Sequence, residues 1–67
     1  MKILLNNIPE SFTEDKFTIT ELLKVKNFTF KMLIVKINGK LVKKTEYDTV
    51  KVNDGDDVMV LHLISGG

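Results

Sequence analysis

The residues of this chain with the clearest chemical potential are its last two, Gly66 and Gly67, which follow the apolar run Val58-Met59-Val60-Leu61-His62-Leu63-Ile64. Neither glycine carries a Cβ atom, so an extended Gly-Gly end can enter a tunnel that is too narrow for ordinary side chains. Ser65, Gly66 and Gly67, at about 3.3–3.6 Å per extended residue, would carry the α-carboxylate roughly 10 Å beyond a folded body. This geometry suits a carboxylate that is presented inside another protein.

The carboxylate of Gly67 is the predicted site of covalent chemistry. An α-carboxyl group has an ordinary pKa near 3.3–3.7, so it is ionised at neutral pH and resists nucleophiles until it is activated. The neighbouring position must lack a side chain for steric reasons, which Gly66 satisfies, and Ser65 is a flexible spacer. The chain has no cysteine and one histidine, which excludes disulfides, thiolate chemistry and a metal site built on these residue types.

Length and composition restrict the class of function. Sixty-seven residues make one small domain, which buries only about 60% of the surface its unfolded chain exposes, so an enclosed enzyme active site is not expected. The apolar content of 43% and the charged content of 28% are ordinary for a globular domain. The cations are ten dispersed lysines without any arginine, and the net charge is only +1, so no nucleic-acid interface is predicted.

The sequence also predicts no membrane partner. No apolar run approaches the roughly 18 residues that a membrane-spanning helix requires. The apolar stretch near Met1 is too short for a signal peptide. A cytoplasmic location is the resulting expectation.

The first half of the chain predicts two strands and one helix. Residues 2–6 place Ile3 and Leu5 on one face, and the turn sequence Asn6-Asn7-Ile8-Pro9 precedes a second strand over residues 10–13. Thr18-Ile19-Thr20-Glu21 has the form of a capping box, which predicts a helix from Thr18 to about Asn27. Phe17, directly before the cap, is expected to staple onto Leu22.

The second half predicts short strands joined by tight turns. Residues 33–37 form a strand with Leu33, Val35 and Ile37 in the core, and Asn38-Gly39 turns the chain into residues 40–42. A helical turn or loop over residues 45–48, a strand over residues 49–52 and a turn at residues 53–56 precede the final strand.

This order of elements predicts an α+β fold of the β-grasp type. A mixed sheet of four to five strands would have one helix across one face, with the first and last strands as parallel neighbours. Residues 1–64 would form the domain and residues 65–67 a flexible tail.

The final strand is apolar on both faces. Val58 and Val60 are assigned to the core, which leaves Met59, Leu61 and Leu63 on the opposite face. Because one helix covers only one face of such a sheet, these three residues are the predicted docking surface for a partner. The alternative is that another part of the chain covers them.

The remaining polar and aromatic residues have structural interpretations. Asp54, Asp56 and Asp57 lack the spacing and the closing glutamate of a calcium loop, so turn formation is their predicted role. His62 is expected to be a partly exposed side chain near the strand end. The phenylalanines are expected in the core or as staples, namely Phe12, Phe17, Phe28 and Phe30.

Five segments together carry a resemblance to a known family: Lys2-Ile3-Leu4-Leu5-Asn6, Thr18-Ile19-Thr20-Glu21-Leu22-Leu23, Val35-Lys36-Ile37-Asn38-Gly39-Lys40-Leu41-Val42, Asp54-Gly55-Asp56-Asp57-Val58 and Gly66-Gly67. With these segments in this order, the chain resembles the ThiS sulfur carriers of thiamin biosynthesis, within the ubiquitin-like ThiS/MoaD group. That family often has Pro-Arg and then Trp where this chain has Lys43, Lys44 and Tyr47. Partner contacts are therefore not carried over to these three positions.

The resemblance implies a chemistry for the tail. A ThiF-like adenylyltransferase that uses ATP and Mg²⁺ would adenylate the Gly67 carboxylate. A sulfur donor such as a cysteine desulfurase would then supply a persulfide that displaces AMP and leaves a Gly67 thiocarboxylate. A ThiG-like thiazole synthase would accept the sulfur. The chain itself would bind no cofactor and would act as a protein substrate and sulfur donor rather than as an enzyme.

Other functions remain open at the level of sequence. A MoaD-like carrier for molybdopterin synthesis shares all the chemistry up to the acceptor. A ubiquitin-like modifier would use the same activated Gly67 to form isopeptide bonds with lysines. A β-grasp interaction module, in which Gly66-Gly67 is incidental, would function without these two residues.

Overall fold

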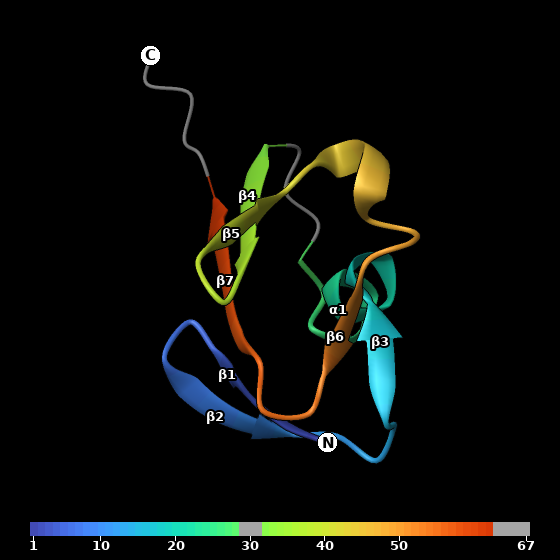
Figure 1. Ribbon diagram of the computed structural model, residues 1–67, viewed down its shortest axis with the longest axis vertical. Helices are drawn as coiled ribbons and strands as arrows, with labels where there is room; N and C mark the ends of the chain where they lie inside the picture. Colours follow the sequence, from blue (N-terminus) through green and yellow to red (C-terminus); the bar gives the residue numbers. More distant parts are fainter. Residues whose placement is uncertain (29–31, 63–67) are drawn as a thin grey trace.

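The computed structural model describes residues 1–28 and 32–62, which contain seven strands, one α-helix and one 3-10 helix (Figure 1). The helical elements are α1 (Ile19–Val25) and η1 (Lys44–Glu46). The strands are β1 (Lys2–Leu5), β2 (Ile8–Ser11), β3 (Lys16–Thr18), β4 (Leu33–Ile37), β5 (Lys40–Val42), β6 (Lys51–Asn53) and β7 (Asp57–His62).

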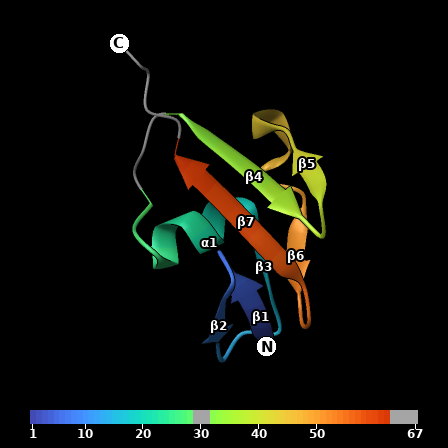
Figure 2. The same ribbon diagram turned by 90° about the vertical axis from the view of Figure 1, so that its left-hand side faces the viewer.

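Five of these strands form one mixed sheet in the order β2-β1-β7-β4-β5, and β3 pairs with β6 in a separate two-stranded sheet. The central strand β7 runs parallel to β1 and antiparallel to β4. Helix α1 lies behind the five-stranded sheet when the sheet faces the viewer (Figure 2). The predicted α+β architecture of the β-grasp type, with parallel first and last strands, is confirmed.

Two tight hairpins use asparagine and glycine in the left-handed region. Asn6 and Asn7 have φ values of 51° and 66°, and Asn38 and Gly39 have 50° and 82°. A two-residue turn in which both residues have positive φ has a twist that matches the right-handed twist of the strands that it joins. The second strand therefore begins at Ile8, two residues before the predicted start. Pro9 lies within β2, an edge strand where its missing N–H removes no necessary ladder bond.

Helix α1 has defined caps at both ends. The Thr18 Oγ1 accepts from the backbone N–H of Glu21 at 3.1 Å, and Glu21 Oε1 accepts from the backbone N–H of Thr18 at 2.9 Å, which confirms the predicted capping box. At the other end Asn27 has a φ of 57°, and the N–H of Phe28 donates to the carbonyl of Leu23 at 2.8 Å. This left-handed termination ends the helix at Val25, two residues earlier than predicted.

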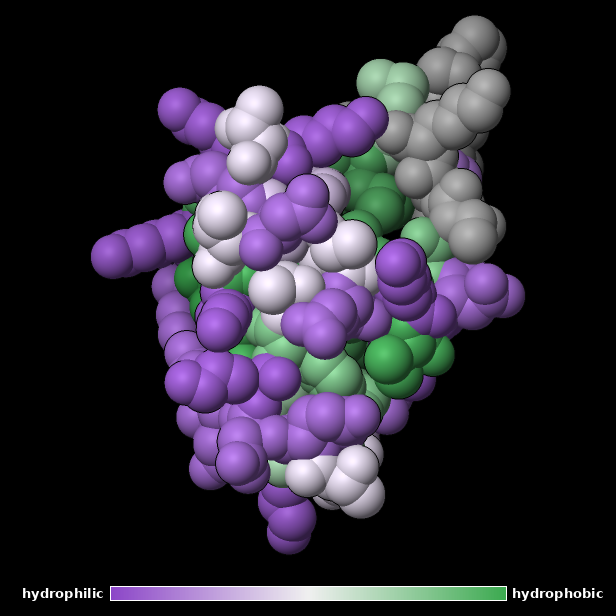
Figure 3. All heavy atoms as spheres, turned by 90° about the vertical axis from the view of Figure 1, so that its right-hand side faces the viewer, coloured by the Kyte–Doolittle hydropathy of each residue, from purple (hydrophilic) through white to green (hydrophobic). Residues whose placement is uncertain are grey.

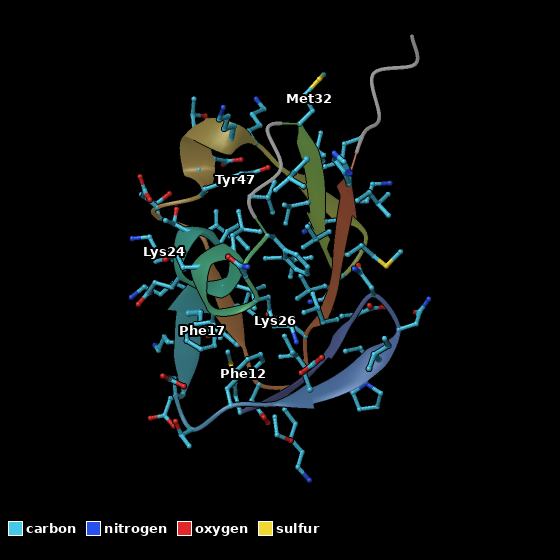
Figure 4. All side chains as sticks on the ribbon, turned by 180° about the vertical axis from the view of Figure 1, so that it is seen from behind. Phe12, Phe17, Lys24, Lys26, Met32 and Tyr47 are labelled. Atoms are coloured by element: carbon cyan, nitrogen blue, oxygen red, sulfur yellow. The ribbon has the colours of Figure 1, made fainter. Side chains whose placement is uncertain are left out.

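Strand β3 was not predicted. Phe17, expected to be a helix staple, lies in this strand opposite Val52 of β6 and is 3% exposed. Its ring meets that of Phe12 edge to face, with centroids 5.0 Å apart (Figure 4). A strand of three residues is too short for alternation to be recognised. The predicted strand over residues 49–52 is β6, displaced by one to two residues.

The core consists of ten buried apolar residues from both sheets and the helix: Ile3, Leu5, Phe17, Ile19, Leu22, Val35, Val42, Val52, Val58 and Val60. The core predictions for Val35, Val58 and Val60 are confirmed, and Ile3 and Leu5, which were predicted to share one face of their strand, are both buried. Leu33 and Ile37 are partly buried at its margin, as are Phe12 and Phe28. Phe30 lies outside the described residues. The predicted helical turn near residues 45–48 is η1.

Candidate functional site at the central strand

Strand β7 leads in sequence to residues 63–67 and is held along both edges. Its register with β4 extends from Ile37 opposite Val58 to Leu33 opposite His62. On the other edge, the N–H of Asn6 donates to the carbonyl of Val58 at 2.9 Å. Strand β7 is thus the central strand of the five and is paired on both sides, so the point from which residues 63–67 continue is fixed relative to the domain.

The acidic residues before β7 build the turn that positions it. Asp56 accepts from the side-chain amide of Asn38 at 3.0 Å and from the N–H of Asn53 at 2.8 Å, through its two different oxygens. The N–H of Asp57 donates to Asn38 Oδ1 at 2.9 Å, and Asp54 Oδ1 accepts from the N–H of Lys2 at 2.7 Å. Within residues 1–28 and 32–62, no group of three or more His, Cys, Asp or Glu side chains is arranged to hold a metal ion.

Met59 and Leu61, predicted to contact a partner, lie on the face of the sheet that α1 does not cover. Alternation along β7 buries Val58 and Val60 on the helix side, while Met59 is partly buried and Leu61 is 43% exposed. Leu63, Ser65, Gly66 and Gly67 lie outside the described residues. The docking surface and the tail site therefore stay predictions, and of the two described docking residues Leu61 is the exposed one.

Other strands extend this surface through residues that the sequence prediction missed. Ile34 of β4 pairs with Leu61, and Leu41 of β5 is 60% exposed opposite Lys36. Leu4 of β1 is 40% exposed and pairs with Asp57 at the start of β7. We call this surface the open face. Its described members are Lys2, Leu4, Pro9, Ser11, Ile34, Lys36, Leu41, Lys43, Asp57, Met59 and Leu61. The sequence signal that could have identified these residues is the alternation of side chains along a strand, because each apolar member lies next to a core residue in its own strand.

The opposite side of the molecule is more polar. Hydrophilic side chains dominate the view onto it, with apolar atoms in smaller areas between them (Figure 3). Lys26 extends from the end of α1 to Glu10 of β2, and the Nζ to Oε2 distance is 3.0 Å (Figure 4). Exposed apolar side chains there, such as Val25 at 55%, occur among charged neighbours. A broad apolar docking surface is therefore better supported on the open face.

Two of the three positions at which the chain departs from its resemblance lie at the end of the sheet where β7 finishes. Strands β5 and β7 run in the same direction, so Lys43 and Lys44 follow β5 at the end of the sheet where β7 finishes (Figure 1). Both lysines are exposed. Tyr47 packs partly buried against the core, and this burial raises the pKa of its hydroxyl. Its carbonyl accepts from the N–H of Thr20 at 3.0 Å, which indicates a structural role.

A hollow of about 410 Å³ lies at the other side of β5, with Lys40, Val42, Glu46, Val50 and Asp56 among its lining residues. Its two carboxylates, those of Glu46 and Asp56, already accept hydrogen bonds within the fold. Glu46 Oε1 accepts from the N–H of Lys43 at 3.0 Å, and Asp56 accepts the two bonds described above. Both carboxylates that line the hollow are therefore engaged in hydrogen bonds of the fold. No helix among the described residues is long and apolar enough to cross a membrane.

A five-stranded β-grasp sheet with one helix, whose parallel central strand leads to a di-glycine end, defines the ubiquitin-like class of small proteins. Within this class the chain belongs to the ThiS family, whose profile matches residues 3–67. Proteins of this family are small sulfur carriers and not catalysts by themselves. The family resemblance drawn from the sequence is thereby confirmed.

Solved structures with the same fold agree with this assignment. The chain is similar to the crystal structure of the thiamine biosynthesis protein ThiS from Geobacter metallireducens, with 28% identity over all of both chains and a TM-score of 0.89. An NMR solution structure of a thiamine biosynthesis protein from Geobacter metallireducens is also 28% identical. It matches over all of this chain and 88% of that one, with a TM-score of 0.81. A comparison with curated protein sequences finds no match.

Proposed function

We propose that this protein carries sulfur for the thiazole branch of thiamin biosynthesis as a thiocarboxylate on Gly67. The observation that carries the proposal is the ThiS family match, which extends through residue 67 and so includes the di-glycine end. The likeness to two thiamine biosynthesis structures favours this acceptor pathway over molybdopterin synthesis. The central, doubly paired position of β7 supports it, because the tail then leaves the domain from a fixed point.

Activation converts the unreactive carboxylate into an acyl donor. A carboxylate oxygen of Gly67 attacks the α-phosphorus of ATP, the bond to the pyrophosphate leaving group breaks, and an acyl-adenylate forms. A ThiF-like adenylyltransferase supplies the binding sites for ATP and Mg²⁺. The missing Cβ atoms of Gly66 and Gly67 let the tail reach that site.

Sulfur enters by substitution at the same carbonyl. The terminal sulfur of a persulfide, supplied by a donor such as a cysteine desulfurase, attacks the adenylate and displaces AMP. The resulting acyl disulfide is cleaved by a thiol, which is oxidised to a disulfide and leaves the Gly67 thiocarboxylate. A ThiG-like thiazole synthase then takes the sulfur. In each step the chain is the substrate, and Met59, Leu61 and Leu63 are its proposed docking residues.

Intact mass spectrometry tests the carrier chemistry. The full chain is incubated with ATP, Mg²⁺, a ThiF-type enzyme, a persulfide donor and a thiol, beside a variant that lacks Gly66 and Gly67. We expect a mass gain equal to replacing one oxygen by sulfur in the full chain, dependent on ATP and absent from the variant. Without the donor, the gain should correspond to an adenylate.

The competing functions give different products in the same assay. Transfer of sulfur to a thiazole synthase and not to a molybdopterin synthase large subunit would support the thiamin assignment. Adducts between Gly67 and lysine side chains would instead indicate a protein modifier. No ATP-dependent change of mass with enzymes that activate their own carriers would overturn the proposal.

A further inference from the structure

We propose that the open face recognises a protein partner whose apolar surface carries carboxylates, and that these carboxylates pair with Lys36 and Lys43. The inference rests on the proposed function only for the identity of that partner, which is taken to be the enzyme that activates the tail. The new element of the inference is the negative charge that the partner must present. This requirement follows from the placement of Lys36 and Lys43 among apolar side chains.

Lys36 lies within the apolar part of the open face. In the sheet register it pairs with Leu41 of β5 on one side and with Met59 of β7 on the other. It is exposed, like Leu41, while Met59 is partly buried. A partner that covers Leu41 and Leu61 must therefore also cover Lys36.

Lys43 extends the same pattern toward the end of β7. Val42 is buried, and the extended backbone of Lys43, with φ −77° and ψ 150°, continues the alternation of β5. Its side chain therefore leaves the chain on the same face as Leu41. Both lysines are neighbours of this exposed leucine: Lys36 pairs with it from β4, and Lys43 follows it by two residues, directly after β5.

Neither lysine is neutralised within the described part of the molecule. Among residues 1–28 and 32–62, the only ion pair joins Lys26 to Glu10 on the other side of the sheet. The carboxylate of the open face belongs to Asp57, at the far end of β7 beside Leu4. Around Leu41, the described part of the open face is thus apolar and cationic.

The free-energy cost of removing the two lysine ammonium groups from water determines which kind of partner can bind this face. Removing a lysine ammonium from water without an anionic partner costs several kcal/mol, so a purely apolar surface would bind this face poorly. Paired carboxylates offset that cost and also increase the rate of association. A second copy of the chain fits badly, because each copy brings Lys2, Lys36 and Lys43 against the single carboxylate of Asp57.

Charge reversal at Lys36 and Lys43 tests the inference. We would measure the rate of ATP-dependent modification by the ThiF-type enzyme as a function of carrier concentration, for wild type and for the double variant K36E/K43E. The KM for the carrier should rise by at least about tenfold, as expected when a buried charge pair is broken, while kcat changes less. The KM of the wild type should increase with salt concentration, and that of the variant should respond more weakly.

The matched control is K16E/K24E, which changes the net charge equally through two exposed lysines of β3 and α1. Its KM should stay within about twofold of the wild type, since neither lysine belongs to the open face and charges outside an interface act mainly on association rates. Circular dichroism melts establish that both variants fold. Equal effects of the two double variants, or no effect of K36E/K43E, would overturn the inference.

Two further measurements separate this inference from the proposed function. Calorimetric titration of the carrier into the activating enzyme without ATP measures docking alone, and K36E/K43E should bind more weakly than K16E/K24E. Docking of the wild type without any mass change would reject the thiocarboxylate proposal and keep the docking inference. Sedimentation that shows a dimer of the free protein, dissociated by Leu41→Asp but not by high salt, would assign the face to a second copy and reject the inference.

Discussion

The side-chain carbonyl of Asn6 accepts a hydrogen bond from the backbone N–H of Val60 at 2.8 Å, joining two residues that are 54 positions apart. β1 pairs with β7 only as far as Leu5 opposite Val58, and at Asn6 the chain turns back toward β2. The amide of Val60 would otherwise lack a partner on this edge of the strand. One turn residue therefore continues the ladder that holds β7, the strand that leads to the tail.

Asn6→Ala is expected to destabilise the protein more than Asn7→Ala. Both substitutions remove an asparagine from the left-handed region, with φ of 51° and 66°, which costs about 1–2 kcal/mol. Only Asn6→Ala also leaves the Val60 amide without its acceptor, which adds about 1–3 kcal/mol. Denaturant unfolding of the two variants measures the difference.

An acceptor at position 6 should restore most of this loss. Asn6→Asp keeps a side-chain oxygen in place and should unfold at a denaturant concentration closer to the wild type than Asn6→Ala. If the two alanine variants lose equal stability, the hydrogen bond from Val60 to Asn6 contributes nothing to the free energy of unfolding.

Leu22→Ala and Leu41→Ala should separate folding from docking. Leu22 of α1 is fully buried, so its truncation should cost about 2–5 kcal/mol in the free energy of unfolding. Leu41 is 60% exposed, and its truncation should change stability by no more than about 0.5 kcal/mol. The measurement is thermal or denaturant unfolding combined with binding to the activating enzyme.

The expected result for Leu41→Ala is weakened docking in a protein of normal stability. A large loss of stability in this variant would show that Leu41 supports the fold, and the open face would then lose its most exposed apolar contact. Unchanged stability in Leu22→Ala would contradict the core described above.

The capping box should make stability depend on pH through Glu21. Hydrogen bonds from the backbone N–H and the hydroxyl of Thr18, with smaller contributions from Lys51 and Lys24, hold the pKa of Glu21 below its ordinary value of 4.5. Between the two pKa values the unfolded state binds more protons, so stability rises with pH in that window. The contribution is complete above the unfolded pKa and is lost as pH falls through the folded pKa.

Glu21→Gln keeps an oxygen acceptor but cannot titrate. Its unfolding free energy should therefore fall less steeply than that of the wild type as pH is lowered through and below about 4.5. Chemical denaturation at a series of pH values measures both slopes. Parallel curves for the two proteins would show that the ionised Glu21 carboxylate does not stabilise the helix start.

Local sequence signals account for much of the fold. The capping box at Thr18 and the Asn38-Gly39 turn act within four residues, so they were predictable without tertiary context. The start of β2 was wrong because Asn6 and Asn7 suffice for a turn, and Ile8 and Pro9 are then free to pair. The end of α1 was wrong because Asn27 takes the left-handed conformation that a cap requires. Strand β3 was missed because Phe17 is buried through its pairing with β6 and not through a local pattern.

The sequence by itself determined the class of this protein, through the order of the five sheet strands and the helix, the core residues Val58 and Val60, and the di-glycine end that suggested a carrier. The tertiary structure decided which residues share the open face, because strand register brings Leu41, Lys36 and Met59 together from three separate segments. It also decided that Asn6 supports Val60 and that Tyr47 supports the core. Propensity and alternation act over a few neighbouring residues, whereas cross-strand contacts depend on how distant segments align.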